Sequence, residues 1–95
     1  TSNIFLVKDG VLITPEKDIL EGVTRKIVLE LAQGVYNIEK REVSFEEIKS
    51  ADEVFITASF KDIVPVVMVD NFNIGDRVVG KVTKDFIERF TKYLS

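Results

Sequence analysis

Two short runs of strand-forming residues meet at an Asp-Gly pair near the start of the chain. Ile4-Phe5-Leu6-Val7 and Val11-Leu12-Ile13-Thr14 flank the connection Lys8-Asp9-Gly10, and Pro15 ends the second run. An Asp-Gly pair between two β-prone runs is the strongest short-range signal for a β-hairpin. The sequence therefore predicts a hairpin over residues 4–14.

After Pro15 the apolar spacing changes from two residues to 3.6, which indicates an amphipathic helix. One face of this helix is apolar and consists of Leu20, Val23, Ile27, Val28 and Leu31. Arg25 and Lys26 lie off that face, Gly22 stands near the helix start, and Gly34 follows its end, where a left-handed cap is expected.

The rest of the chain predicts a mixed sheet with helices packed on it. Ser44 and Glu47 form a capping box that predicts a short helix ending near Ser50. A final amphipathic helix is capped by Thr83 and carries Phe86, Ile87, Phe90 and Leu94 on one side. The expected strands are an edge strand within residues 35–43, a strand over 53–58, and a strand over 63–69 followed by a turn over 70–76.

The strand over residues 63–69 is nearly continuous in apolar residues, as a strand buried on both faces would be. Pro65 cannot donate to a β-ladder, so its end of the strand is expected at an edge or a bulge. The predicted order is β-β-α-β-α-β-β-α, an α/β piece with no internal repeat. Fold class alone carries no function.

The composition excludes several kinds of chemistry. The 95 residues contain no Cys and no His, which excludes thiol nucleophiles, Ser-His-Asp hydrolysis and almost any transition-metal site, so no metal is expected. The formal net charge is −3, and a phosphate-backbone binder normally carries a basic stripe, so no nucleic-acid partner is expected. No apolar stretch approaches the ~20 residues that span a bilayer, so no membrane partner is expected either.

Two segments could bind an anion. A phosphate could bind at the helix start, beside Gly22, to the backbone amides of Val23 and Thr24. The Thr24 hydroxyl and the helix dipole would support this binding. The alternative is that Gly22 only begins the helix, and from the pattern alone that reading is favoured. The polar residues at 57–62 could point hydroxyl and backbone donors into a cleft, or could simply form a turn.

Two pairs of adjacent carboxylates could suggest acid–base chemistry: Glu46/Glu47 and Asp52/Glu53. Neighbouring side chains on a helix or strand point apart, so a shared site is geometrically poor. Both pairs are therefore expected on a solvated face.

Taken together, these segments resemble the class IV aminotransferases, the pyridoxal-phosphate enzymes of fold type IV. This family includes branched-chain and D-amino-acid aminotransferases and aminodeoxychorismate lyase. Five motifs occur in the family's order and spacing: Asn3-Ile4-Phe5 with Lys8-Asp9-Gly10, Thr14-Pro15, Ile19-Leu20-Glu21-Gly22-Val23-Thr24-Arg25, Ala51-Asp52-Glu53-Val54-Phe55, and Ile63-Val64-Pro65-Val66. The resemblance covers residues 3 to about 83 and implies the large C-terminal domain of that fold, a pseudo-barrel, over residues 1–95.

The resemblance implies roles for particular residues. The helix start at Gly22, Val23 and Thr24 would bind the phosphate of pyridoxal 5'-phosphate, and Leu20 would lie against the pyridine ring. Ser59 would also contact the phosphate, and the backbone N–H of Phe60 would help to hold the substrate carboxylate. The aminotransferases usually have Thr and a small residue at this turn, so Ser59 keeps the hydroxyl while Phe60 narrows the substrate side.

The resemblance also implies what lies elsewhere. The family's Schiff-base lysine, the glutamate that pairs with the pyridine nitrogen and an arginine on the phosphate would all precede Thr1. The chain is therefore expected to be a C-terminal fragment of an aminotransferase, without a catalytic residue of its own and inactive alone. Pyridoxal phosphate acts as an electron sink only when protein groups protonate its ring nitrogen and move the proton.

Three functions remain open at this point. The first is transfer of an amino group between an amino acid, of the branched-chain type, and a 2-oxo acid. The second is elimination of pyruvate from aminodeoxychorismate, and the third is a non-enzymatic interaction domain. The resemblance further implies a homodimer with active sites close to the subunit interface, and the composition predicts a cytoplasmic location.

Overall fold

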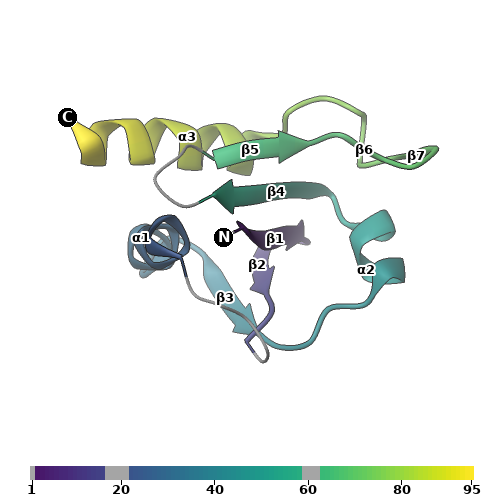
Figure 1. The fold of residues 1–95 in the computed structure, drawn as a ribbon, viewed down its shortest axis with the longest axis horizontal. Helices are drawn as coiled ribbons and strands as arrows, with labels where there is room; N and C mark the ends of the chain where they lie inside the picture. Colours follow the sequence, from purple (N-terminus) through teal and green to yellow (C-terminus); the bar gives the residue numbers. More distant parts are fainter. Residues whose placement is uncertain (1, 17–21, 59–62) are drawn as a thin grey trace.

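A computed structural model describes residues 2–16, 22–58 and 63–95 (Figure 1). Its helices are α1 (Val23–Ala32), α2 (Phe45–Ser50) and α3 (Lys81–Leu94). Its strands are β1 (Ser2–Lys8), β2 (Val11–Thr14), β3 (Asn37–Lys40), β4 (Glu53–Ala58), β5 (Ile63–Val66), β6 (Met68–Val69) and β7 (Phe72–Asn73). This order contains the predicted β-β-α-β-α-β-β-α series, with the β6–β7 ribbon added before the last helix.

Five strands form one mixed sheet in the order β3-β2-β1-β4-β5. The predicted hairpin is confirmed, because β1 and β2 are antiparallel with Lys8 opposite Val11 across the turn. The edge position of β3 is confirmed too, and β3 runs parallel to β2. Strand β1 therefore lies in the centre of the sheet, between β2 and β4.

The apolar run at residues 63–69 does not form the continuous strand that its composition predicts. It divides into β5 at the sheet edge and β6, which pairs with β7 in a separate two-stranded ribbon. The prediction of a strand buried on both faces is wrong, because Val64 is 43% exposed and Met68 is 37% exposed. Pro65 stands in the edge strand β5, as a residue without a backbone donor should.

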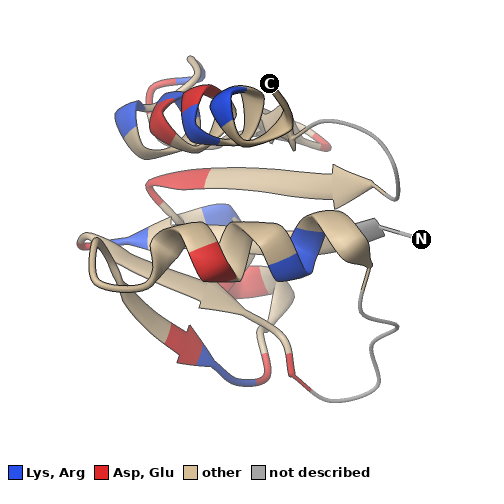
Figure 2. Cartoon of the chain, turned by 90° about the vertical axis from the view of Figure 1, so that its left-hand side faces the viewer, with Lys and Arg blue, Asp and Glu red and all other residues tan. Residues whose placement is uncertain are grey.

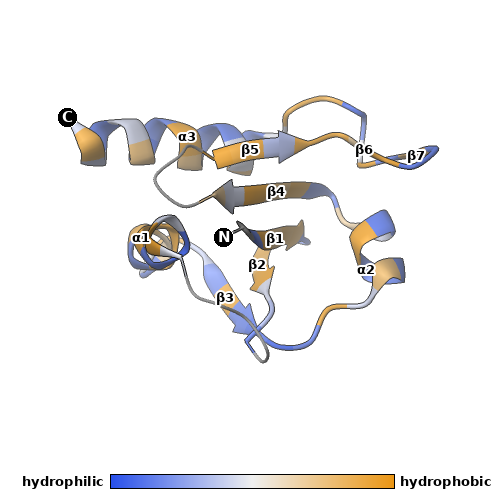
Figure 3. Cartoon of the chain, viewed as in Figure 1, coloured by the Kyte–Doolittle hydropathy of each residue, from blue (hydrophilic) through white to orange (hydrophobic). Residues whose placement is uncertain are grey.

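The main core lies between the sheet and the helices α1 and α3 (Figures 1 and 3). The Phe5 and Phe55 rings, on the paired strands β1 and β4, stack with centroids 5.0 Å apart. Phe86 of α3 adds a third ring, 5.7 Å from Phe55. Three fully buried aromatic side chains thus join the centre of the sheet to α3.

A second, smaller core lies on the other side of the sheet. Its buried members are Leu6, Ile13, Ala51, Val54 and Ile74. The capping box predicted for α2 is confirmed, with Ser44 accepting from the Glu47 amide and the Glu47 side chain accepting from Ser44. The Lys49 ammonium lies 5.0 Å from the Phe45 ring centroid and 4.3 Å from that of Phe72, so it joins α2 to the β6–β7 ribbon.

The apolar face predicted for helix α1 is confirmed after its first turn, since Val28 is buried and Ile27 and Leu31 pack against the main core, but it is wrong at the helix start. Val23 is 55% exposed, whereas Thr24 and Arg25 are buried. The Arg25 guanidinium is accommodated because its Nη2 donates to the carbonyl of Pro15 at 2.9 Å. The helix end is as predicted, with Gly34 in the left-handed conformation at φ +77°.

Helix α3 begins at Lys81 with Gly80 as its N-cap, so the prediction that Thr83 caps it is wrong. Thr83 lies in the first turn, where its backbone N–H and hydroxyl both donate to Glu53 Oε1 at 2.7 Å. The Val82 amide donates to Glu53 Oε2 at 3.1 Å. The cap is therefore a carboxylate on β4, and Glu53 is a partly buried anchor rather than a residue of a solvated face.

Charged residues of both signs are interspersed along α3 (Figure 2). Asp85 pairs with Arg89 at 2.8 Å, and Glu88 pairs with Lys92 at 3.4 Å, each across one helical turn. Within the described part of the chain, no helix has the length and apolarity needed to cross a membrane.

Candidate functional site

The start of α1 lies beside the ends of the two paired strands β1 and β4. In Figure 1 the first residues of β1 and the arrowhead of β4 both point toward α1. Asn3 and Thr57 are paired in the β1–β4 ladder at this end. The sequence motifs at residues 3–5, 22–25 and 57–58, far apart in the chain, therefore meet at one place.

Two hydrogen bonds fasten the helix start to the strands. The Gly22 amide donates to Oδ1 of Asn3 on β1 at 3.2 Å, and the Thr24 hydroxyl donates to the carbonyl of Ala58 on β4 at 3.0 Å. We call the group formed by Asn3, Gly22, Val23, Thr24, Thr57 and Ala58 the helix-start site. Its position in the fold is set by both β1 and β4.

The electrostatics of the helix-start site suit an anion. The N-cap residue Gly22 is extended, at φ −80° and ψ 160°, and having no side chain it makes no side-chain capping hydrogen bond to α1. The first turn contains no acidic residue. Helix N-termini concentrate backbone N–H groups and the positive end of the macrodipole, worth roughly half an elementary charge.

From the sequence, the Thr24 hydroxyl is expected to donate a hydrogen bond to a phosphate. In this structure it donates to the carbonyl oxygen of Ala58 instead. A hydroxyl has one proton to donate. With that bond in place, Thr24 joins helix to strand, and the donors on which an anion could draw are backbone amides.

Thr57 is the first residue of the segment 57–62, for which the sequence leaves open either donors in a cleft or a turn, without a role assigned to Thr57 by itself. It is 1% exposed, and its Oγ1 has no hydrogen-bond partner among the described residues. The two-residue alternation of β4 was the available signal, since it places Thr57 on the same side as the core residue Phe55. A buried polar atom without a partner is uncommon in folded proteins and calls for a physical reason.

The structure brings together three of the residues predicted to bind the cofactor. Gly22, Val23 and Thr24 form the start of α1, with the Val23 side chain exposed. Leu20, Ser59 and Phe60 lie outside the described residues. Among the residues that the structure does describe, no three His, Cys, Asp or Glu side chains are grouped to hold a metal ion.

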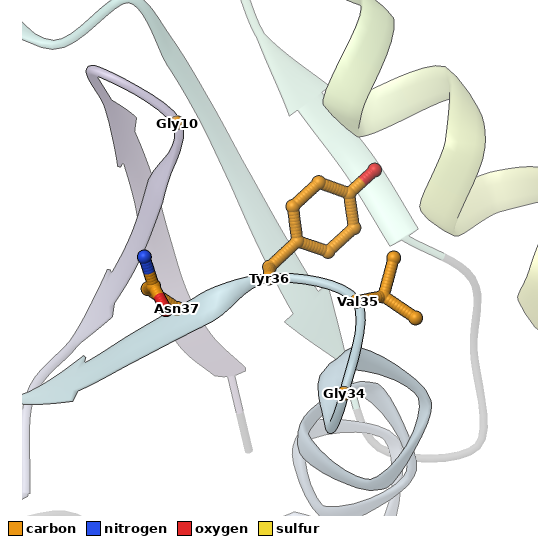
Figure 4. A pocket seen from close by; sticks show the side chains of 5 residues that line it. All are labelled: Gly10, Gly34, Val35, Tyr36 and Asn37. Carbon is orange, nitrogen blue, oxygen red and sulfur yellow. The ribbon is translucent and has the colours of Figure 1, made fainter.

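A shallow cavity of about 350 Å³ lies at the opposite end of α1 (Figure 4). It is lined by Gly10, Gly34, Val35, Tyr36 and Asn37. The Tyr36 hydroxyl donates to Asp85 Oδ2 at 2.5 Å. Burial, and then this hydrogen bond, raise the pKa of Tyr36 to about 12, so the phenol stays neutral near pH 7 and cannot act there as a base.

Comparisons with known proteins agree with this geometry. The family model for amino-transferase class IV matches residues 1–69. A probable branched-chain-amino-acid aminotransferase from Aquifex aeolicus is 37% identical, covering 98% of this chain and 35% of the relative. A D-alanine aminotransferase from Staphylococcus haemolyticus is 36% identical, covering 99% of this chain and 34% of the relative. The chain thus spans about a third of the length of these relatives.

Solved structures give the same result. The branched-chain amino acid aminotransferase from Thermobaculum terrenum, in its holo (PLP) form, superposes with a TM-score of 0.91 at 31% identity, over 98% of this chain and 32% of that one. The branched-chain amino acid aminotransferase from Escherichia coli gives 0.89 at 36% identity, over 95% of this chain and 32% of that one. In sequence and in its mixed α/β fold, the chain belongs to the class IV aminotransferases.

Proposed function

We propose that the helix-start site binds the phosphate of pyridoxal 5'-phosphate, in a protein that transfers amino groups between an amino acid and a 2-oxo acid. The observation that carries the proposal is a helix N-terminus with no side-chain cap from Gly22, next to a buried hydroxyl that the described residues leave without a partner. A bound phosphate would accept hydrogen bonds both from the start of the helix and from this hydroxyl. Membership of the class IV family supports this choice of anion.

The residues at the site fit a phosphate dianion. Their donors are neutral backbone amides on a helix dipole, and the first turn of α1 brings no carboxylate that would repel the anion. The hydrogen bonds to Asn3 and Ala58 hold these amides in a fixed place before a ligand arrives. Such preorganisation reduces the entropy that binding would otherwise lose.

The part of these residues in the reaction is binding and orientation. Bound pyridoxal phosphate supplies an electron sink for the substrate carbanion. Anchoring its phosphate at α1 would fix where the ring lies relative to β1 and β4. We place the Schiff-base lysine and the carboxylate on the ring nitrogen outside residues 1–95, and we assign Leu20 to the ring, Ser59 to the phosphate and Phe60 to the substrate carboxylate.

The substrate we propose is a branched-chain amino acid, with a 2-oxo acid as acceptor, in a cytoplasmic homodimer. Relatives named for branched-chain amino acids and for D-alanine are almost equally similar, at 37% and 36% identity. An assay of the protein should therefore include both L-branched-chain amino acids and D-alanine. Release of pyruvate without an oxo-acid acceptor would instead indicate the lyase reaction.

The decisive experiment changes the charge of an exposed residue in the first turn of α1. Val23→Asp places a carboxylate beside the amides, and Val23→Asn is its neutral control of similar size. A like charge near a phosphate dianion costs about 1–2 kcal/mol in a partly screened site. We expect the aspartate variant to bind pyridoxal phosphate at least about tenfold more weakly than the asparagine variant, measured by absorbance titration of the protein.

A folding defect would not produce this result. Val23 is 55% exposed, and an acidic residue at a helix N-terminus stabilises the helix. The aspartate variant should therefore unfold at the same or a higher temperature than the asparagine variant. Equal cofactor affinity in the two variants would overturn the proposal.

A further inference from the structure

We propose that Thr57 belongs to the ligand-binding residues of the helix-start site. Its hydroxyl donates a hydrogen bond to the phosphate bound at the start of α1. The inference rests on the proposed function and extends it to a side chain on β4. It starts from one observation, the buried Oγ1 of Thr57 without a hydrogen-bond partner in the described part of the chain.

The position of Thr57 connects it to both fastening hydrogen bonds. Its partner in the β1–β4 ladder is Asn3, which accepts the Gly22 amide. Its neighbour Ala58 accepts the Thr24 hydroxyl. Thr57 is thus enclosed between the two points where α1 is held to the sheet.

The side on which Thr57 lies agrees with this role. Phe55, two residues earlier on β4, packs in the core that α1 and α3 cover, and side chains two apart on a strand share a face. The Thr57 side chain is therefore on the α1 side of the sheet. On that side the residue is 1% exposed, so its hydroxyl cannot be satisfied by bulk water.

The free protein holds the buried Thr57 hydroxyl without a hydrogen-bond partner among the described residues. A buried hydroxyl without a partner destabilises the protein, and a hydrogen bond to a charged group is stronger than one to a neutral group. An anion at the helix start would give the Thr57 proton an acceptor that the described chain does not provide. The free-energy penalty of the unpaired hydroxyl, which is present in the free protein, would then disappear when the phosphate binds.

One substitution at Thr57 should have opposite effects on the stability of the free protein and on cofactor binding. Thr57→Val keeps the branched shape but removes the hydroxyl. In the protein freed of cofactor, the valine variant should be at least as stable as the wild type in thermal unfolding. The dissociation constant for pyridoxal phosphate should be at least about tenfold higher in the valine variant than in the wild type. This is the usual effect of losing a hydrogen bond to a charged group.

Thr57→Ser is the matched control, because it restores the hydroxyl and loses only the methyl group. We expect it to bind pyridoxal phosphate within a few-fold of the wild type. A valine variant that binds like the wild type would overturn the inference, as would one destabilised equally with and without cofactor. If the Val23 variants show the charge effect and the Thr57 variants do not, only the role of Thr57 fails.

Discussion

Oδ1 of Asn3, on the central strand β1, accepts the backbone N–H of Gly22 at the N-cap of α1. Asn3 is 8% exposed, so its carboxamide meets the helix in a nearly dry place. The hydrogen bond joins a strand and a helix through residues that lie 19 positions apart in the chain. Its contribution should therefore be measurable as stability.

Replacing Asn3 with Ala removes the oxygen that accepts the hydrogen bond from the Gly22 amide. Losing one partner of a buried hydrogen bond costs about 1–3 kcal/mol. We expect a loss in that range in the free energy of unfolding, measured by urea denaturation. Asn37→Ala, at an exposed position of β3, is the control and should stay within about 0.5 kcal/mol of the wild type. Equal effects at the two positions would contradict the assigned role.

Glu53 is predicted to be the main support of the α3 start. Its carboxylate accepts three hydrogen bonds from Val82 and Thr83 and complements the helix dipole. Glu53→Gln should lower the free energy of unfolding by about 1–3 kcal/mol, because one carboxylate oxygen becomes an amide donor that faces donors. Glu88→Gln on the exposed side of α3 should change it by less than about 0.5 kcal/mol. Similar losses in both variants would indicate that Glu53 acts only through net charge.

Gly75→Ala tests a close approach of two backbones. A Cβ on Gly75 would lie 2.4 Å from the carbonyl oxygen of Asp52, and Gly75 has φ +54°. Gly34 has φ +77° but open space around a Cβ, so Gly34→Ala measures the conformational strain alone. We expect Gly34→Ala to cost about 1 kcal/mol and Gly75→Ala clearly more, in thermal or urea unfolding. A smaller cost at Gly75 would show that the ribbon before α3 moves freely away from Asp52.

Alkaline pH should weaken the contact between Tyr36 and α3. Burial and the hydrogen bond to Asp85 raise the pKa of Tyr36 from 10.0 to about 12 in the folded protein. A group whose pKa is higher in the folded state contributes stability that is complete below pH 10 and is lost as pH rises to about 12. Stability profiles over this interval should fall more steeply for the wild type than for Tyr36→Phe. Parallel profiles would contradict the assignment.

The same hydrogen bond acts at acid pH with the opposite sign. Donation from Tyr36, followed by the interactions with Arg89, lowers the pKa of Asp85 below its ordinary value. A carboxyl with a lowered folded-state pKa contributes stability above its unfolded pKa and loses it as pH falls through the folded one. Asp85→Asn should therefore flatten the acid limb of the stability profile, while a control variant, Asp70→Asn on the exposed turn of the ribbon, should not.

Elements specified by neighbouring residues could be predicted from the sequence. The Asp9-Gly10 turn, the Ser44–Glu47 capping box and the left-handed Gly34 each depend on a few adjacent positions, and each is confirmed. The glycine at position 22, where the apolar spacing changes to 3.6 residues, likewise located the start of α1. Local chemistry was sufficient in these cases because the interacting groups are close in sequence.

Features that depend on distant residues could not be predicted. Thr83 has the composition of a cap, but a carboxylate from β4 already satisfies the first turn of α3. Arg25 is buried with its Nη2 donating to the carbonyl of Pro15, and Val23 is exposed although Val28 of the same predicted face is buried. For Thr57, strand alternation indicates the burial, but no pattern indicates that the described residues leave its hydroxyl without a hydrogen-bond partner.

The two bonds that hold the start of α1 join residues 19 and 34 positions apart. A nascent chain that has left the ribosome only as far as α1 has the helix but lacks Ala58, to which Thr24 must attach. The Thr24–Ala58 bond therefore cannot form before β4 has been translated, and under the proposed function the phosphate site is complete only from that point on.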